Sequence, residues 1–115
     1  MYEAEFSKID ELRHILARSS RIVFLGGAGT STEGGIPDFR SSEGVFAAAR
    51  DYGYSPETLL SHSFFLKHTE TFYDYYRKFL LYPDAQPNDC HRALVRLERE
   101  GVLSAVVTQN IDGLH

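Results

Sequence analysis

Residues 22–32 read IVFLGGAGTST, and this stretch decides the fold class. Its opening run of four apolar residues is typical of a strand that is buried on both faces of a sheet. The glycines that follow predict a tight turn, and Thr30, Ser31 and Thr32 belong to the residue types that begin helices. A strand, a glycine turn and a helix start in this order indicate the opening of an α/β nucleotide-binding unit.

Residues 103–107 read LSAVV, are mostly apolar and predict a second strand. Asn88 is placed to cap the helix before this strand, and Gly101 stands where a helix end favours a left-handed residue. One apolar face of that helix comprises Cys90, Leu94 and Leu97. Because helices join the two strands, we expect the strands to lie parallel, with a right-handed crossover.

The segment between the strands is predicted to be partly loop and partly helical. Residues 41–55 lack a sustained period and predict a long loop with one helical turn around residues 47–49. Ser55 followed by Pro56 marks a helix start, and an aromatic stripe at helical spacing stops near Pro83. We therefore expect a helical insertion near residues 55–83, packed beside the sheet.

An amphipathic helix is predicted at the start of the chain. Its apolar residues recur at helical spacing, and the pattern places its cap at Ser7 and its end near Ser19. Charged residues interrupt this segment, which argues against a signal peptide, and no apolar run approaches membrane-spanning length. We expect neither a targeting segment nor a membrane partner.

Composition indicates one ordinary folded domain. The chain has 115 residues, of which 43% are hydrophobic and 24% are charged. The formal net charge is -4, and the basic residues are spread among acidic ones, so no nucleic-acid partner is expected. The lone cysteine, Cys90, excludes an internal disulfide framework, suits a reducing cytoplasm and is expected to be buried. Cysteine and histidine spacing indicates no metal site.

The glycine turn is the first candidate site. Glycines let the backbone approach a pyrophosphate closely, and the start of a following helix favours anionic oxygen. However, the usual dinucleotide fingerprint has a third glycine where Thr32 stands, and an acidic residue about 20 positions further on. Neither is clearly present, so at this point a simple tight turn in some other α/β protein stays open as an alternative.

Residues 35–41 read GIPDFRS and form the second candidate. Pro37 stiffens the backbone, while Asp38, Phe39 and Arg40 offer an acceptor, a flat ring and a bidentate phosphate partner within one loop. An ordinary exposed salt bridge between Asp38 and Arg40 is the alternative.

Residues 108–115 read TQNIDGLH and directly follow the second strand. Open α/β sheets bind ligands at the carboxyl ends of their strands, so this polar segment would stand beside the glycine turn if the strands are neighbours. The alternative is that Asp112 and Gly113 only form a turn.

These three motifs together resemble the sirtuin family in its bacterial form, in spacing as well as in identity. Pro87, Asn88 and His91 also match, so the resemblance extends over nearly the whole chain from Ile22 onward. Gly26 departs from the pattern, because many members of the family have threonine there. The resemblance implies an α/β fold, a Rossmann-like parallel sheet fragment with the helical insertion, and makes residues 1–115 the amino-terminal part of a catalytic domain.

The resemblance also implies NAD as the cofactor. The positions that match the NAD-contacting residues of the family are Gly27, Ala28, Gly29, Ser31, Thr32, Ile36, Pro37, Asp38, Phe39, Arg40, Gln109, Asn110, Ile111 and Asp112. If the roles of the matching family residues apply here, the glycine turn lines the phosphates of NAD, Arg40 adds positive charge there, and Phe39 covers the nicotinamide side. Gln109 and Asn110 hold the nicotinamide ribose, and the last two positions form the carboxamide pocket. Asn110 and Asp112 are the positions that support catalysis.

The activity implied by the resemblance is NAD-dependent deacylation of lysine in proteins. The acyl-lysine oxygen attacks the ribose carbon as nicotinamide leaves, the acyl group passes to ADP-ribose, and a histidine acts as general base. That histidine and the four-cysteine zinc module belong to family motifs beyond residue 115, and His115 matches a noncatalytic position. We expect the 115-residue chain alone to be inactive, with zinc and an acylated lysine partner in the full-length enzyme.

Two other functions are weighed against this one. Two parallel strands leave bare edges, whereas parallel sheets are normally multi-stranded and covered. This predicts a truncated domain, or a noncatalytic NAD-binding or interaction module that pairs with another chain through an open edge. An NAD-dependent oxidoreductase is disfavoured, because a long loop stands where an acidic residue after a nearby strand is expected. The remaining histidines and the aromatic stripe are predicted to be structural.

Overall fold

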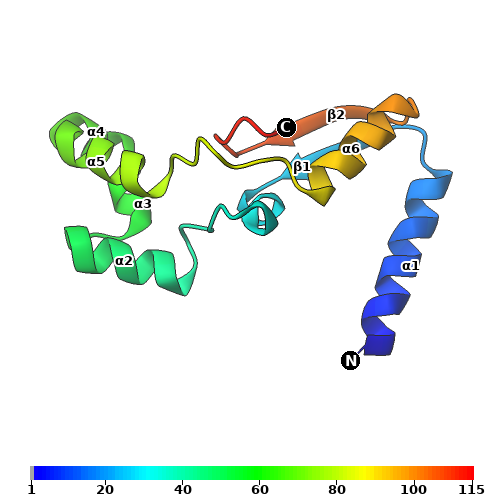
Figure 1. The fold of residues 1–115 in the computed structure, drawn as a ribbon, viewed down its shortest axis with the longest axis horizontal. Coiled ribbons are helices and arrows are strands. Elements are labelled where there is room, and N and C mark those ends of the chain that lie inside the picture. Colours follow the sequence, from blue (N-terminus) through cyan, green and yellow to red (C-terminus); the bar gives the residue numbers. More distant parts are fainter. Residues whose placement is uncertain (1) are drawn as a thin grey trace.

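The computed structural model describes residues 2–115 and shows an α/β arrangement of helices around a small sheet (Figure 1). The elements in chain order are α1 (Tyr2–Arg18), β1 (Ile22–Gly26), η1 (Ala28–Thr30), η2 (Thr32–Gly34), α2 (Ser42–Tyr52), α3 (Pro56–Leu59), α4 (His62–Lys67), α5 (Thr69–Phe79), α6 (Asp89–Arg99) and β2 (Leu103–Thr108).

β1 and β2 pair in parallel and form a two-stranded sheet, which confirms the predicted strands and their direction. The register places Ile22 opposite Leu103 and Gly26 opposite Thr108. The two strands therefore end side by side, so the segments that leave them start from the same edge of the sheet.

α6 has the cap that the sequence predicts. The Asn88 side chain accepts from the backbone N–H groups of Cys90 and His91, and the His91 side chain accepts from the Asn88 N–H, which completes a capping box. Gly101 follows the helix with a φ of 79°, in the left-handed region where glycine carries no steric cost. Asn88 and Gly101 therefore fix the two ends of the helix that leads into β2.

Four helices, α2 to α5, form a separate group at one end of the molecule (Figure 1). Their core contains Ala48, Leu59, Phe64 and Tyr75, with Tyr52, Phe72 and Phe79 packed around it. The aromatic stripe predicted on α5 therefore does pack inward. The helical insertion itself begins at Ser42 and not near residue 55.

The predicted loop at residues 41–55 is wrong, because α2 occupies most of it. Ser41 caps this helix by accepting from the N–H of Gly44, and Gly53 ends it. Gly44 lies so close to Phe39 that a Cβ atom there would stand 2.4 Å from the Phe39 carbonyl oxygen. A glycine in the first turn and exposed apolar residues at Val45 and Phe46 hide the helical period in the sequence.

Three further predictions need correction. Ser7 lies inside α1 and is not its cap. The glycine turn leads into two short 3-10 turns, η1 and η2, and not into an α-helix. Cys90 is exposed, because the capping box draws His91 inward and the buried face of α6 contains His91 and Leu94 instead.

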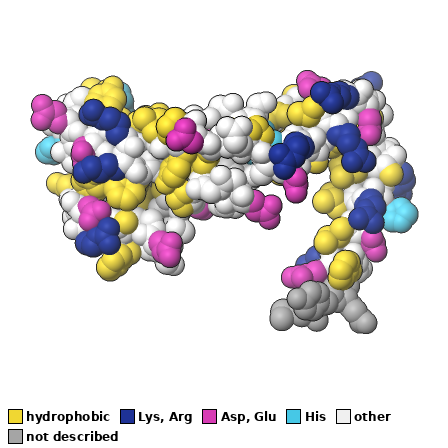
Figure 2. All heavy atoms as spheres, in the orientation of Figure 1, with side chains coloured by type: hydrophobic (Ala, Val, Ile, Leu, Met, Phe, Trp, Pro, Cys, Tyr) yellow, Lys and Arg dark blue, Asp and Glu magenta, His cyan; other side chains and the backbone are white. Residues whose placement is uncertain are grey.

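The molecule is elongated, and α1 projects away from the sheet (Figure 1). The radius of gyration is 17.7 Å, whereas a compact domain of this length has about 13 Å. Phe6, Ile9, Leu12 and Ile15 of α1 are exposed. Figure 2 shows hydrophobic side chains along this projecting helix. No helix among residues 2–115 has the length and apolar character needed to cross a membrane.

Leu59→Ala tests the core of the helical group. Leu59 is fully buried, so we expect the substitution to lower the free energy of unfolding by about 2–5 kcal/mol. Leu66→Ala is the matched control, since Leu66 is 64% exposed and its loss is expected to cost less than about 0.5 kcal/mol. Urea denaturation followed by circular dichroism measures both, and equal losses would contradict this assignment of the core.

Candidate functional site

The candidate site lies where the segments that leave β1 and β2 meet. The Gln109 N–H donates to the Gly26 carbonyl oxygen at 3.2 Å, which extends the strand pairing by one step. The Asn110 side-chain amide then donates to the Gly27 carbonyl oxygen at 2.9 Å. The polar segment after β2 is therefore tied directly to the glycine turn, as the sequence predicts for neighbouring strands.

Ser31 and Asp112 form the central polar contact of the site. Ser31 is 1% exposed, and its hydroxyl donates to Oδ2 of Asp112 at 2.6 Å. The other carboxylate oxygen, Oδ1, accepts from the Leu114 N–H at 3.0 Å. With one donor on each oxygen, the carboxylate is held in one orientation. An ionised carboxylate has about four lone-pair sites, so Asp112 retains acceptor capacity for a further donor.

A cavity of about 300 Å³ opens beside this contact. Its polar lining residues are Ser31, Gln109, Asn110 and Asp112. The rest of the lining is mainly apolar: Ala28, Ile36, Pro37, Phe39, Leu60, Phe72, Tyr76, Phe79, Leu80 and Ile111. A mainly apolar lining with a few polar groups is typical of small-molecule sites.

The glycine turn leaves open space beside its backbone. A Cβ atom built on Gly27 or Gly29 would meet no atom within 4 Å, and neither residue has a positive φ. Neither the backbone conformation nor the packing of this chain therefore requires glycine at these positions. The open space is consistent with a ligand that approaches the backbone closely. The anion-favouring α-helix start expected there is absent, because the 3-10 turns η1 and η2 follow instead.

The loop of residues 35–41 contributes through two different contacts. Ile36, Pro37 and Phe39 line the cavity, whereas Asp38 accepts from the Arg40 backbone N–H at 2.9 Å. The guanidinium of Arg40 lies over the Phe39 ring, at 5.5 Å from its centroid, and its Nε is 3.9 Å from Oε1 of Glu57. The alternative of an ordinary Asp38–Arg40 salt bridge is therefore not what the structure contains.

Several predicted site residues do not line this cavity. They are Gly27, Gly29, Thr32, Asp38 and Arg40, all of which lie on the neighbouring turn and loop. The Thr32 hydroxyl donates back to the Gly29 carbonyl oxygen at 3.1 Å. The predicted residues thus fall into two groups, one around the cavity and one along the glycine turn and the loop after it.

α6 supports the site in a way that the sequence does not reveal. The Asn88 side-chain amide donates to the Thr30 carbonyl oxygen at 2.6 Å, so the residue that caps α6 also holds the glycine turn. His91, next to it, is 3% exposed. Burial lowers the pKa of His91, and the nearby His115 and Arg92 lower it further against the opposing effect of Asp112. The sequence identifies Asn88 as a cap, but a contact between distant segments has no local signal.

The family is decided by comparison with known proteins. A family model described as the Sir2 family matches residues 27–115. The chain belongs to the Sir2 family. This confirms the resemblance read from the three motifs, all of which lie within or at the edge of the matched range.

Curated relatives of this Sir2 chain include two clostridial proteins named NAD-dependent protein deacetylase. The one from Clostridium acetobutylicum is 54% identical over 94% of this chain and 44% of its own length. The one from Clostridium tetani is 55% identical over 90% of this chain and 42% of its own length. The chain therefore spans a little over two fifths of the curated relatives that it matches.

Solved Sir2 structures share the fold of this chain. One, described as "Structural Basis for the Mechanism and Regulation of Sir2 Enzymes", superposes with a TM-score of 0.79 at 38% identity, over 95% of this chain and 41% of its own. Another, described as "Sir2-p53 peptide-NAD+", has a TM-score of 0.72 at 39% identity, over 91% and 39%. No cluster suited to a metal ion is found among residues 2–115 of this chain. No three or more of their histidine, cysteine and acidic side chains are grouped so that they could hold one.

Ser31→Ala tests the central contact. We expect it to lower the free energy of unfolding by about 1–3 kcal/mol, because it removes a buried donor to a carboxylate. Ser42→Ala is the control, since Ser42 is exposed at the start of α2. Denaturant unfolding of both variants measures the difference, and an unaffected Ser31→Ala protein would show that the contact contributes nothing to the fold.

Proposed function

We propose that this chain forms the NAD-binding part of an NAD-dependent protein deacetylase that acts on acylated lysine. The observation that carries the proposal is the oriented carboxylate of Asp112 at the edge of an apolar cavity. A nicotinamide group has the complementary form, a flat ring with one carboxamide. Family membership and the names of the clostridial relatives support the same activity.

In this proposal, the polar residues that line the cavity bind the nicotinamide end of NAD. Asp112 has lone pairs to accept from the carboxamide nitrogen, and Phe39 and Ile111 contribute apolar contact to the ring. The Asn110 amide nitrogen is held by Gly27, which leaves its side-chain oxygen to accept from a ribose hydroxyl. Gln109, beside it, offers a second amide to the same sugar. These residues orient the bond between nicotinamide and ribose, which is the bond that breaks.

The glycine turn binds the phosphates in this proposal. Gly27 and Gly29 leave space for close approach, and Arg40 supplies the positive charge. Arg40 is held only by a 3.9 Å contact to the exposed Glu57 and by the Phe39 ring, so its side chain can turn toward a phosphate at little cost. When bound, NAD supplies an electrophilic ribose carbon to the acyl-lysine oxygen.

Nicotinamide release tests the proposed activity. The full-length protein, meaning the whole natural polypeptide that carries this sequence, is expected to release nicotinamide from NAD only when an acetylated peptide is present. The 115-residue chain alone is expected to release none. Binding of NAD by the full-length protein without any release would instead favour the noncatalytic NAD-binding module.

Asp112→Asn tests which end of NAD the cavity holds. We expect the variant to bind NAD about tenfold more weakly, because a charged acceptor is lost, and to bind ADP-ribose almost unchanged, because that ligand has no nicotinamide. Arg40→Ala is the matched comparison and is expected to weaken both ligands alike. Calorimetry of the full-length protein measures all four affinities.

Two outcomes would contradict these assignments. If Asp112→Asn weakened NAD and ADP-ribose equally, the nicotinamide group would not be the partner of this carboxylate. If either variant melted many degrees below the parent protein, the residue would be structural and its effect on binding indirect.

A further inference from the structure

His91 is a buried histidine with one nitrogen that has no partner. Its Nδ1 lies 3.1 Å from the backbone nitrogen of Asn88, whose N–H it accepts in the capping box, and 3.0 Å from Oδ1 of the same residue, to which a protonated Nδ1 would donate. The capping-box contact belongs to the neutral ring that carries its proton on Nε2. Nε2 is buried and makes no hydrogen bond within the described chain. Buried polar groups are normally satisfied, so this position calls for a physical account.

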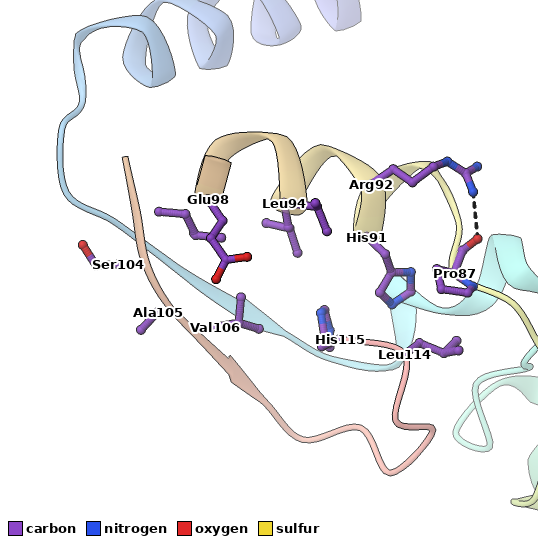
Figure 3. Close-up of a pocket in the computed structure, with 12 residues that line it drawn as sticks. Pro87, His91, Arg92, Leu94, Glu98, Ser104, Ala105, Val106, Leu114 and His115 are labelled. Carbon is purple, nitrogen blue, oxygen red and sulfur yellow. Dashed lines mark hydrogen bonds between the residues drawn. The ribbon is translucent and has the colours of Figure 1, made fainter. Parts of the chain in front are cut away.

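The ring of His91 packs against His115. Figure 3 shows the two side chains between α6 and the segment that follows β2, in a cavity of about 440 Å³. The ring centroids are 4.8 Å apart. His115 also packs against the end of β1, since a Cβ atom at Gly26 would stand 3.1 Å from its Nε2 and 2.9 Å from the Phe24 ring. The end of β1, the segment that carries Asp112 and the first turn of α6 therefore meet at these rings.

Asn88 links His91 to the glycine turn as well. The backbone N–H of Asn88 is held by His91, and its side-chain amide donates to the Thr30 carbonyl oxygen at 2.6 Å. Any movement of the Asn88 backbone thus reaches the turn directly. Through Asn88 and His115, His91 contacts both segments that form the site.

We propose that His91, in its neutral form, is a positioning residue of the NAD site, which holds the glycine turn and the Asp112 segment at the spacing that NAD requires. The identity of the ligand rests on the proposed function, whereas the coupling between the two segments rests on the contacts above. His91 itself does not line the cavity beside Asp112, so it acts through Asn88 and His115.

Protonation of His91 removes this support. A proton on Nδ1 ends its role as acceptor for the Asn88 N–H and directs Nδ1 at Oδ1 of Asn88, which already accepts from two backbone N–H groups. It also places a charge in a buried position near His115 and Arg92, opposed by Asp112. Glu98 lies on the same helix at the cavity shared with His115. The pKa of His91 is lowered below its ordinary value of 6.5, chiefly by burial. The stabilising contribution of neutral His91 is therefore present above pH 6.5 and is lost as the pH falls through the lowered pKa.

The test compares variants of the full-length protein. His91→Gln keeps a neutral acceptor at the capping-box position and does not titrate, and His91→Leu keeps apolar volume but removes the acceptor. His62→Gln is the control, since His62 is exposed on α4. NAD affinity is measured by calorimetry in steps from about pH 7.5 to about pH 5, so that the range extends well below the ordinary histidine pKa.

We expect the parent protein and His62→Gln to bind NAD progressively more weakly as the pH falls below 6.5, by up to about tenfold at the lowest pH, the order expected for loss of one hydrogen bond. His91→Gln is expected to bind within about twofold of the parent at the highest pH and to lose the pH dependence. His91→Leu is expected to be about tenfold weaker at the highest pH. A His91→Gln protein with the parent's pH profile, or a His91→Leu protein with the parent's affinity, would overturn the proposal.

A second measurement needs no ligand. Nuclear magnetic resonance follows the Thr30 amide signal from about pH 7.5 to about pH 5, a range that includes the ordinary histidine pKa. Two proteins are compared, the His115→Gln variant and the His115→Gln, His91→Gln double variant. We expect an inflection below the ordinary histidine pKa that disappears when His91 is replaced. An unchanged inflection would overturn the coupling. If the parent protein bound no NAD at any pH, the proposed function would fail, and this titration would still decide the coupling.

Discussion

The parallel pairing of β1 with β2 is the constraint on which the site depends. It brings Ser31 and Asp112, which are 81 residues apart in the chain, within hydrogen-bonding distance. The register matters as much as the pairing, because Gly26 lies opposite Thr108 and both strands end together. A slip of one residue would turn every side chain of a strand to the other face of the sheet. The cavity, the carboxylate and the glycine turn all follow from this alignment.

Much of this arrangement is predictable from local sequence. The apolar runs predict both strands, Asn88 and Gly101 predict both ends of α6, and the rule that ligands bind at strand carboxyl ends places residues 108–115 beside the glycine turn. These predictions are correct because each depends on a few neighbouring residues with a strong physical preference. The three motifs also predict the family, and the match to the Sir2 family model confirms it.

What the sequence does not predict depends on specific contacts that the pattern of apolar and polar residues does not reveal. The sequence does not predict α2, because Gly44 in its first turn resembles a loop residue. Glycine is required there by the close approach of the Phe39 backbone and not by a loop. Cys90 fits an apolar helical face, yet the capping box turns His91 inward in its place. Arg40 is two residues from Asp38 in sequence, but its side chain pairs with Glu57 on α3, and Asp38 accepts from the Arg40 backbone N–H. In each case a specific contact overrides the pattern of residue types.

The position of Phe39, which lines the cavity, depends on Gly44, which does not line it. The Phe39 carbonyl group occupies the space next to Gly44 in which any other amino acid would carry its first side-chain carbon. The start of α2 and the Phe39 part of the cavity lining are thereby in direct contact. Addition of one methyl group at Gly44 would displace the peptide that carries the aromatic ring and so alter the apolar lining of the cavity. The shape of the cavity is consequently sensitive to the start of a helix whose residues do not line it.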